Sequence, residues 1–217
     1  MRGVTDEGGK RFHTTPYGYT VRYRSVMPRP AGRSRLSAAD WAEAALAALR
    51  EGGGLAAIAI EPLAAGLGAT KGSFYWHFAN REALIEAALA RWETSQTEEV
   101  IAALGQERDP LARIRELFTT ATEMATRDAT ELVLLAEAAH PQVAAVLRRV
   151  VTRRLDYLTG LFVELGLDAA EARIRSVQTY SGYLGRAQLA RAVPDVMSHG
   201  EDNRRYLDAV LESLLGR

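Results

Sequence analysis

Side chains able to do covalent or metal chemistry are few and scattered in this sequence. The 217 residues include no cysteine, and the four histidines (His13, His77, His140 and His199) lack the spacing of a metal motif such as HExxH. We find no phosphate-binding glycine loop followed by Lys-Ser or Lys-Thr, and no GxSxG nucleophile motif. The sequence therefore predicts no catalytic residue, no metal ion and no cofactor, and nothing in it favours an all-α enzyme.

A different chemistry is concentrated in one stretch, IEPLAAGLGATKGSFYWHFANR at residues 60–81. Ser73 and His77 can hydrogen-bond base edges or phosphates, and Tyr75 can bond a phosphate. Lys71 and Arg81 supply positive charge at opposite ends of the segment. These residue types, placed close together, are suited to contact with a nucleic acid.

The helical period of this stretch separates its aromatic residues into two groups. On a helical wheel Phe74 and Phe78 share a face, and we expect them to pack into a core. The opposite arc and its flanks hold the remaining polar and aromatic residues: Gly72, Ser73, Tyr75, Trp76 and His77. The alternative is that all these aromatic rings are core, which is the commoner role of such a cluster.

Two short helices joined by a tight turn are needed to present these residues. Pro62 fits a helix over 60–67 only because it lies in the first turn, and Gly68 provides the turn. A second helix is predicted over 70–78, which makes a helix-turn-helix. Ser37 is expected to cap a helix before this pair, over 37–50, and Asn80 one after it that runs toward Glu99.

The second half of the chain repeats the helical period without any strand pattern. Apolar stripes predict helices within residues 110–126, 130–139, 142–166, 168–192 and 202–215. With those of the first half, this makes about nine helices and an all-α fold. We expect a basic arm at 1–35, a three-helix DNA-binding domain at 36–82 and a helical ligand-binding and dimerisation domain at 83–217.

Charge is distributed unevenly although the net charge is zero. Residues 1–35 hold eight basic and two acidic side chains, and the remaining residues 19 basic and 25 acidic. A basic arm is one footprint of a nucleic-acid binder, and a solvated leader is the alternative. Met27 offers a second start, which would make residues 1–26 non-native. The chain shows neither a membrane-spanning run nor a secretory signal, so we expect a cytoplasmic protein without membrane partners.

The segment from about 36 to 95 resembles the N-terminal domain of the tetracycline-repressor (TetR) family of transcriptional regulators. The match rests on the turn glycine, the aromatic cluster and the following cap, with TKGSFYWHFANREAL at 70–84 similar to the family's recognition helix. The resemblance implies a ligand-responsive regulator, most often a repressor, that binds a pseudo-palindromic double-stranded operator as a homodimer. It also implies the DNA contacts: Arg33, Arg35, Thr70, Lys71, Gly72, Ser73, Tyr75, Trp76, His77 and Arg81.

The resemblance further implies a dimer interface and a small-molecule pocket in the second half. The dimer would use the helices at 168–192 and 202–215, whose apolar residues are Ile174, Val177, Leu184, Leu189, Tyr206, Val210 and Leu214. The candidates for effector binding are Trp92, Phe118, Met124, His140, Tyr157, Phe162, Tyr180 and Tyr183. The alternative for both sets is that they are core of a single chain, because periodicity alone does not separate these roles.

Two features depart from the resemblance. Ala59 stands where a capping Ser or Thr that also touches phosphate is common, at a cost of about 1 kcal/mol in capping. Residues 36–100 hold four basic and nine acidic side chains, which is unfavourable beside DNA. The second hypothesis is therefore a helical small-molecule-binding or interaction protein that has lost DNA binding. The effector, operator and regulated genes are not encoded in these patterns.

Overall fold

The computed structural model describes residues 12–14, 20–22, 36–197 and 200–215. The chain divides into two compact units, Met1–Leu36 and Ser37–Arg217, each considered by itself. In the first unit β1 (Phe12–Thr14) pairs antiparallel with β2 (Thr20–Arg22), with Phe12 opposite Arg22. The sequence pattern predicted no strand, so this short pair of strands differs from the prediction. Arg33, Arg35 and most of residues 1–26 lie outside the described residues.

The second unit begins with a capped helix, α1 (Ala38–Gly52). Asp40 donates its backbone N–H to the Ser37 hydroxyl, and its carboxylate accepts from the Ser37 N–H at 2.8 Å. This capping box confirms the predicted start of the helix. Gly53 caps the C-terminal end of the helix, and its φ of 81° lies in the left-handed region that favours glycine. A 3₁₀ turn, η1 (Leu55–Ala57), follows.

Three helices complete the N-terminal domain: α2 (Ile60–Leu67), α3 (Lys71–Tyr75) and α4 (Arg81–Glu93). The bounds of α2 agree with the predicted helix at 60–67. The helix α3 is shorter than the predicted 70–78: it ends at Tyr75, and a hydrogen-bonded turn follows in which the His77 and Phe78 N–H groups donate to the Phe74 carbonyl. Asn80 caps α4 as predicted, accepting from the Ala83 N–H at 2.9 Å. The expected domain boundary at 82/83 falls inside α4.

The helix α4 continues without interruption into the second half. A π-helical turn, η2 (Thr94–Glu98), leads directly into α5 (Glu99–Leu104). The other helices are α6 (Pro110–Arg127), α7 (Thr130–Ala136), α8 (Pro141–Glu164), α9 (Ala169–Ala192) and α10 (Gly200–Leu215). With α4, η2 and α5 taken as one, these helices give the predicted number within 36–197 and 200–215, and the all-α fold is confirmed there.

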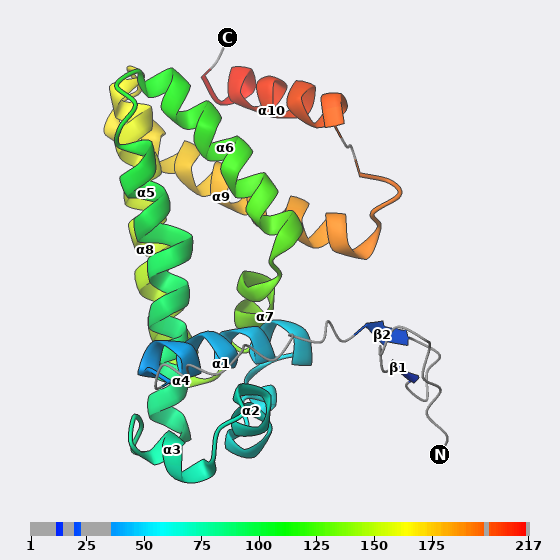
Figure 1. The fold of residues 1–217 in the computed structure, drawn as a ribbon. Helices are drawn as coiled ribbons and strands as arrows, with labels where there is room; N and C mark the ends of the chain where they lie inside the picture. The colour runs from blue at the N-terminus through cyan, green and yellow to red at the C-terminus, as the bar shows by residue number, and fades with distance from the viewer. Residues whose placement is uncertain (1–11, 15–19, 23–35, 198–199, 216–217) are drawn as a thin grey trace. The chain divides into compact units, whose positions relative to one another are not determined.

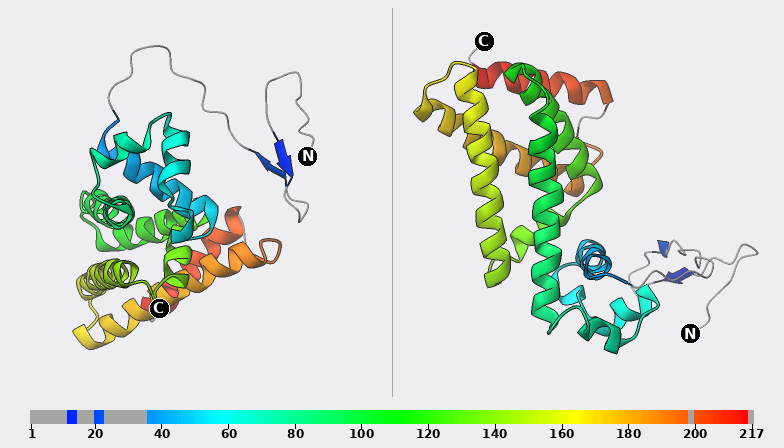
Figure 2. Two further views of the ribbon diagram at one scale, coloured as in Figure 1. Left: turned by 90° about the horizontal axis from the view of Figure 1, so that it is seen from below. Right: turned by 60° about the vertical axis from the view of Figure 1, so that its left-hand side comes forward.

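The long helices α4–α5 and α8 lie side by side and connect two groups of helices (Figure 1). One group is α1, α2 and α3, and the other is α6, α9 and α10, as both views of Figure 2 also show. Each group has its own buried core. Trp41, Phe74 and Trp92 are in the first core, and Phe162 and Tyr180 are in the second. Among the described helices, none has the length and apolarity needed to cross a membrane.

Candidate nucleic-acid interface and ligand cavity

The turn between α2 and α3 is tight because of one glycine. Gly68 has a φ of 63°, and its N–H bonds to the carbonyls of Ala64 and Ala65. The Ala69 N–H closes the turn on the Ala64 carbonyl at 2.8 Å. Thr70 then caps α3, its hydroxyl accepting from the Ser73 N–H at 3.1 Å. The two helices therefore form the predicted helix-turn-helix.

The inner side of α3 is anchored by aromatic packing. The Phe74 side chain is fully buried, and its ring centroid lies 5.4 Å from Trp41 and 5.6 Å from Phe78. The edge-to-face contact with Trp41 ties α3 to α1. The prediction that Phe74 and Phe78 are core residues is confirmed.

The outer side of α3 and the turn that follows it expose aromatic surface. Trp76 is 78% exposed and Tyr75 is 52% exposed. In the same segment Thr70 and Gly72 are also exposed, while Ser73 and His77 are half-buried. Large exposed aromatic rings on a short, well-anchored helix indicate a binding surface, because burying them within the chain would have been favourable.

Lys71 has an ion-pair partner that the sequence analysis missed. Its Nζ lies 2.5 Å from Glu61 Oε1 on α2, and both side chains are exposed. The hydrogen bond from Lys71, then a backbone hydrogen bond, then the charge of Lys71 lower the pKa of Glu61, and the contact with Glu61 raises the pKa of Lys71. Because the two residues are ten apart across a turn, helical periodicity gave no signal of this pair.

Arg81 is held inside the domain. Its guanidinium donates to the carbonyl oxygens of Ile58, at 2.6 Å, and of Leu55. It thereby fixes the start of α4 against η1, next to α3. The phosphate contact proposed for Arg81 on the basis of resemblance stays a prediction, and in this structure the side chain binds backbone instead.

A cavity of about 520 Å³ lies between the second group of helices and the long helices α4–α5 and α8. Its wall comes from η2, α5, α6, α8, α9 and α10. Five of the predicted effector-binding residues line it: Phe118, Met124, Tyr157, Tyr180 and Tyr183. The sequence analysis assigned α9 and α10 to a dimer interface, but in this structure both also form cavity wall.

The other three candidates lie away from this wall. Trp92 is buried in the first core, and Phe162 is fully buried in the second. His140 is the N-cap residue of α8, with its Nδ1 buried and without a hydrogen-bond partner among the described residues. A helical stripe places these residues inward, but periodicity does not distinguish core from cavity wall.

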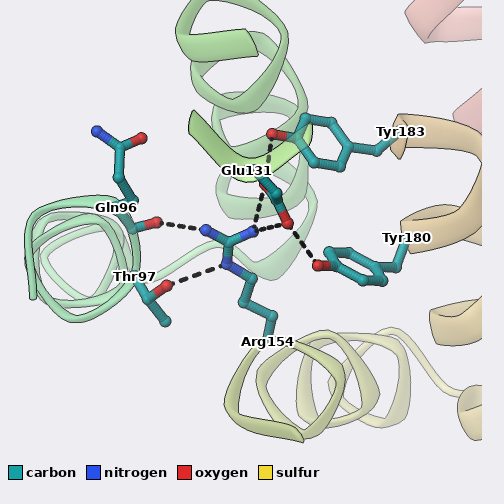
Figure 3. A network of polar contacts seen from close by, with 6 residues as sticks. All are labelled: Gln96, Thr97, Glu131, Arg154, Tyr180 and Tyr183. Carbon is teal, nitrogen blue, oxygen red and sulfur yellow. Dashed lines mark hydrogen bonds and ion pairs between the residues drawn. The ribbon is translucent and has the colours of Figure 1, made fainter. Parts of the chain in front are cut away.

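A buried polar network centred on Glu131 and Arg154 joins residues that line the cavity (Figure 3). Arg154 Nη1 donates to both carboxylate oxygens of Glu131, at 2.8 and 2.9 Å. Its Nε donates to Thr97 Oγ1 and its Nη2 to the Gln96 carbonyl, both at 3.0 Å. Glu131 also accepts from the tyrosine hydroxyls of α9, at 2.5 Å from Tyr180 and 3.0 Å from Tyr183.

Burial and charge stabilise this network in one protonation state. Burial opposes the charged form of Arg154, but the charge and hydrogen bonds of Glu131 together with the two tyrosines outweigh it and raise the pKa of Arg154. Burial, and then the charge of Glu131, raise the pKa of Tyr180 and Tyr183 far above the ordinary value. The network is thus one cation, one anion and two neutral hydroxyls. Sequence reasoning found the two tyrosines but missed Glu131 and Arg154.

The short helix α7 connects this network to the DNA-binding domain. It carries Glu131, and residues flanking it reach α1 and η1. Asp128 Oδ2 lies 3.4 Å from Arg50 Nε, and Glu137 Oε1 accepts from the Leu55 N–H at 3.3 Å. Leu55 in turn accepts from Arg81 through its carbonyl. The cavity wall and the recognition segment are therefore linked by contacts through α7.

An apolar stripe on α9 faces away from the chain. Ile174, Val177 and Leu189 are 53%, 45% and 50% exposed. The residues predicted on α10 behave differently, because Leu214 is buried and Val210 packs against the second core. For α10 the single-chain alternative accounts for those two residues, while α9 keeps its exposed stripe.

Comparison with known proteins finds a sequence match over part of the chain and a shared fold. Residues 43–88 match the family described as bacterial regulatory proteins, tetR family. No curated protein sequence matches the chain. The fold is shared with a transcriptional regulator from Rhodococcus sp. Rha1, at 21% identity and a TM-score of 0.64 over 83% of this chain and 95% of that one.

Two further solved structures share the fold. SmeT, the repressor of the Stenotrophomonas maltophilia multidrug efflux pump SmeDEF, is 20% identical with a TM-score of 0.63, over 84% of this chain and 90% of SmeT. FadR from Bacillus subtilis, solved with stearoyl-CoA, is 16% identical with a TM-score of 0.59, over 81% of this chain and 96% of FadR. At these identities the likeness establishes the fold alone.

Proposed function

Because the chain is a DNA-binding transcriptional regulator of the TetR family, we propose that it is a ligand-responsive repressor that binds a pseudo-palindromic operator as a homodimer. It would act in the cytoplasm, where its operator is. The observation that carries the proposal is the surface of α3, where Tyr75 and Trp76 are exposed while Phe74 is buried. The rings of Tyr75 and Trp76 thus lie on the solvent side, while the opposite side of the helix packs against the domain through Phe74.

The DNA contacts would come from this surface and its neighbours. Ser73 and His77 would meet base edges, and Tyr75 a phosphate, with Trp76 beside them. Lys71 would reach DNA by exchanging its contact with Glu61 for a phosphate. Thr70 and Gly72 allow a close approach of the backbone. Arg33 and Arg35, outside the described residues, would add charge.

A gel-shift assay with DNA flanking the chain's own gene, at stated salt, tests this proposal. Wild type should prefer a flanking duplex over random duplex, and Tyr75→Ala and Lys71→Ala should weaken that preference. Equal binding to flanking and random DNA, or unchanged binding by both variants, would count against it.

A homodimer would form through the exposed stripe of α9. Two recognition helices must lie about one DNA turn apart, roughly 34 Å, to enter successive major grooves. Gly185 on the same helix has open space where a Cβ would lie, so a second helix could approach closely there, whereas Gly182 lines the cavity. A two-fold arrangement would bring two copies of the stripe together and bury Ile174, Val177 and Leu189.

The cavity would bind the effector, with Phe118, Met124, Tyr157, Tyr180 and Tyr183 on its wall. A ligand acts as an inducer only if it binds more tightly to the state with low DNA affinity. The structure offers two contacts through which such a state could differ. Arg154 holds the π-turn that continues α4, and Glu131 lies on α7, which contacts α1 and η1.

The second candidate is a helical small-molecule-binding protein without DNA binding. One observation favours it: Lys71, on the recognition helix, already has an acidic partner, within a region of net negative charge. This candidate predicts ligand affinity without operator preference and with little dependence on salt. The gel-shift assay above, repeated at several salt concentrations, separates the two candidates.

A further inference from the structure

The charged side chains on the described wall of the cavity are all basic. Among the described residues that line it, the charged side chains are Arg154 and Arg186, and none is acidic. Arg186, on α9, donates to the Asn203 side chain of α10 and lies over the Tyr206 ring, 4.4 Å from its centroid. Most other lining residues are apolar, such as Ile101, Leu117 and Val210. Arg186 is thus engaged by an amide oxygen and an aromatic ring, and the chemistry of the ligand depends further on whether Arg154 is available.

Arg154 is not available to an anionic ligand. Its side chain is 16% exposed, and its ion-pair partner Glu131 is 9% exposed. Four of its five N–H donors are used, two by Glu131 and one each by Thr97 and Gln96. A ligand carboxylate would have to displace Glu131, and an unpaired buried carboxylate is strongly disfavoured.

Glu131 is equally unavailable to a cationic ligand. Each of its carboxylate oxygens accepts from Arg154 and from one tyrosine, Oε1 from Tyr180 and Oε2 from Tyr183. An ammonium ligand would find no free acidic group on the described wall. The charges of Glu131 and Arg154 are thus balanced by each other inside the protein.

Two residues that line the cavity, Tyr157 and Thr179, carry buried hydroxyl groups. The Thr179 Oγ1 atom has no hydrogen-bond partner among the described residues, and the Tyr157 hydroxyl makes no hydrogen bond of good geometry there. Burial raises the pKa of Tyr157, and the nearby Arg113 opposes that rise. An unsatisfied buried hydroxyl costs about 1–3 kcal/mol. A hydroxyl or carbonyl oxygen on a bound molecule would recover that hydrogen bond.

We propose that the cavity takes an uncharged, mainly apolar molecule that carries one hydroxyl or carbonyl oxygen, and that Glu131 sets this selectivity by neutralising Arg154. Tyr157 and Thr179 would bind the polar oxygen, and the apolar wall would bury the rest. A volume of about 520 Å³ suits a small ligand of this class. The inference rests on the proposed role of the cavity as the effector site.

The direct test is a charge series of one chain length: 1-decanol, decanoate and decylammonium. Binding to the wild-type protein is measured by calorimetry below the micellar range and without DNA. We expect 1-decanol to bind at least about tenfold more tightly than either ion, which corresponds to about 1.4 kcal/mol. Tighter binding of decanoate or decylammonium, or no binding of 1-decanol, would overturn the proposal.

The variant Glu131→Gln tests the role of the ion pair. It keeps a side chain of the same shape but leaves Arg154 without its counter-ion, so decanoate should gain at least about tenfold in affinity relative to 1-decanol. The double variant Glu131→Gln with Arg154→Gln should lose that gain. Unchanged preference in Glu131→Gln, with its fold verified by circular dichroism, would refute the role of Glu131.

Arg186→Gln separates the second arginine from the first. If Glu131→Gln gains decanoate binding through Arg154, then adding Arg186→Gln should leave the gain in place. Loss of the gain would assign anion binding to Arg186 and overturn the proposed role of the Glu131 pair. Since no titration contains DNA, failure of operator binding and failure of this proposal give separate results.

Discussion

Lys71 on the recognition helix lies 2.5 Å from Glu61 on the preceding helix, Nζ to Oε1. The pair couples α2 to α3 on an exposed surface, where such contacts contribute little to stability. Its importance lies in DNA binding, because a phosphate must compete with Glu61 for the same ammonium group.

Replacing Glu61 by Gln should therefore strengthen DNA binding. With the carboxylate gone, Lys71 can hold a phosphate without competition, and the slope of log K against log salt should steepen by up to about 0.9. Fluorescence anisotropy with a duplex over a range of salt concentrations measures both effects. Glu123→Gln makes the same charge change on α6 and should leave the slope unaltered. An unchanged or shallower slope in Glu61→Gln would show that Lys71 does not contact phosphate.

Introducing a charge into the α9 stripe should dissociate the proposed dimer. Val177→Glu places a carboxylate opposite its own copy across a two-fold axis, where it would be desolvated and repelled. Sedimentation velocity should show a dimer for wild type and a monomer for the variant. Val196→Glu, the same change at a valine 74% exposed between α9 and α10, is the matched control. A dimer that persists in Val177→Glu would place the interface elsewhere.

A double-mutant cycle should reveal the contact between α7 and η1. Gly54 has a φ of 113°, and a Cβ there would lie 2.2 Å from Glu137 Oε1. Gly54→Ala should lower the free energy of unfolding by at least about 1 kcal/mol, from backbone strain and this clash. In Glu137→Ala the clash is gone, so Gly54→Ala should cost less there. Denaturant unfolding measures the four species. Strict additivity would mean that Glu137 does not approach Gly54.

The fold was largely predictable because its signals are local. Ser37, Gly68 and Asn80 cap or turn the chain through contacts within a few residues, and the structure has these caps and this turn. The inward direction of Phe74 and the outward direction of Trp76 follow from a single helical period. These features need no knowledge of tertiary structure.

The site was less predictable because its contacts are long-range. Glu131 and Arg154 are 23 residues apart, on different helices, and each alone looks like a solvated charge. Trp92, Phe162 and Phe118 have the same apolar signature and all three are core residues, yet of the three Phe118 alone also lines the cavity. Which buried residue meets a cavity depends on how whole helices pack.

Tyr180 and Tyr183 should stay protonated when ordinary tyrosines ionise. Burial, and then the charge of Glu131, raise the pKa of each, so both remain neutral in the folded protein. A raised pKa adds stability that is complete below the unfolded value, near pH 10, and is lost as the pH rises above it. Absorbance at 295 nm should show these two tyrosines ionising only as circular dichroism reports unfolding. Their ionisation within the folded protein near pH 10 would contradict the buried network.

The central claim is that α3 presents Trp76 and its neighbours to a specific DNA sequence. Selection from a pool of random duplexes, followed by sequencing of the bound fraction, tests it most directly. We predict enrichment of two inverted half-sites by wild type, and loss of that enrichment in Trp76→Ala, whose thermal stability should change little because the ring is exposed. A pool that stays random with wild type, or a Trp76→Ala variant that enriches the same sequence equally well, would contradict it.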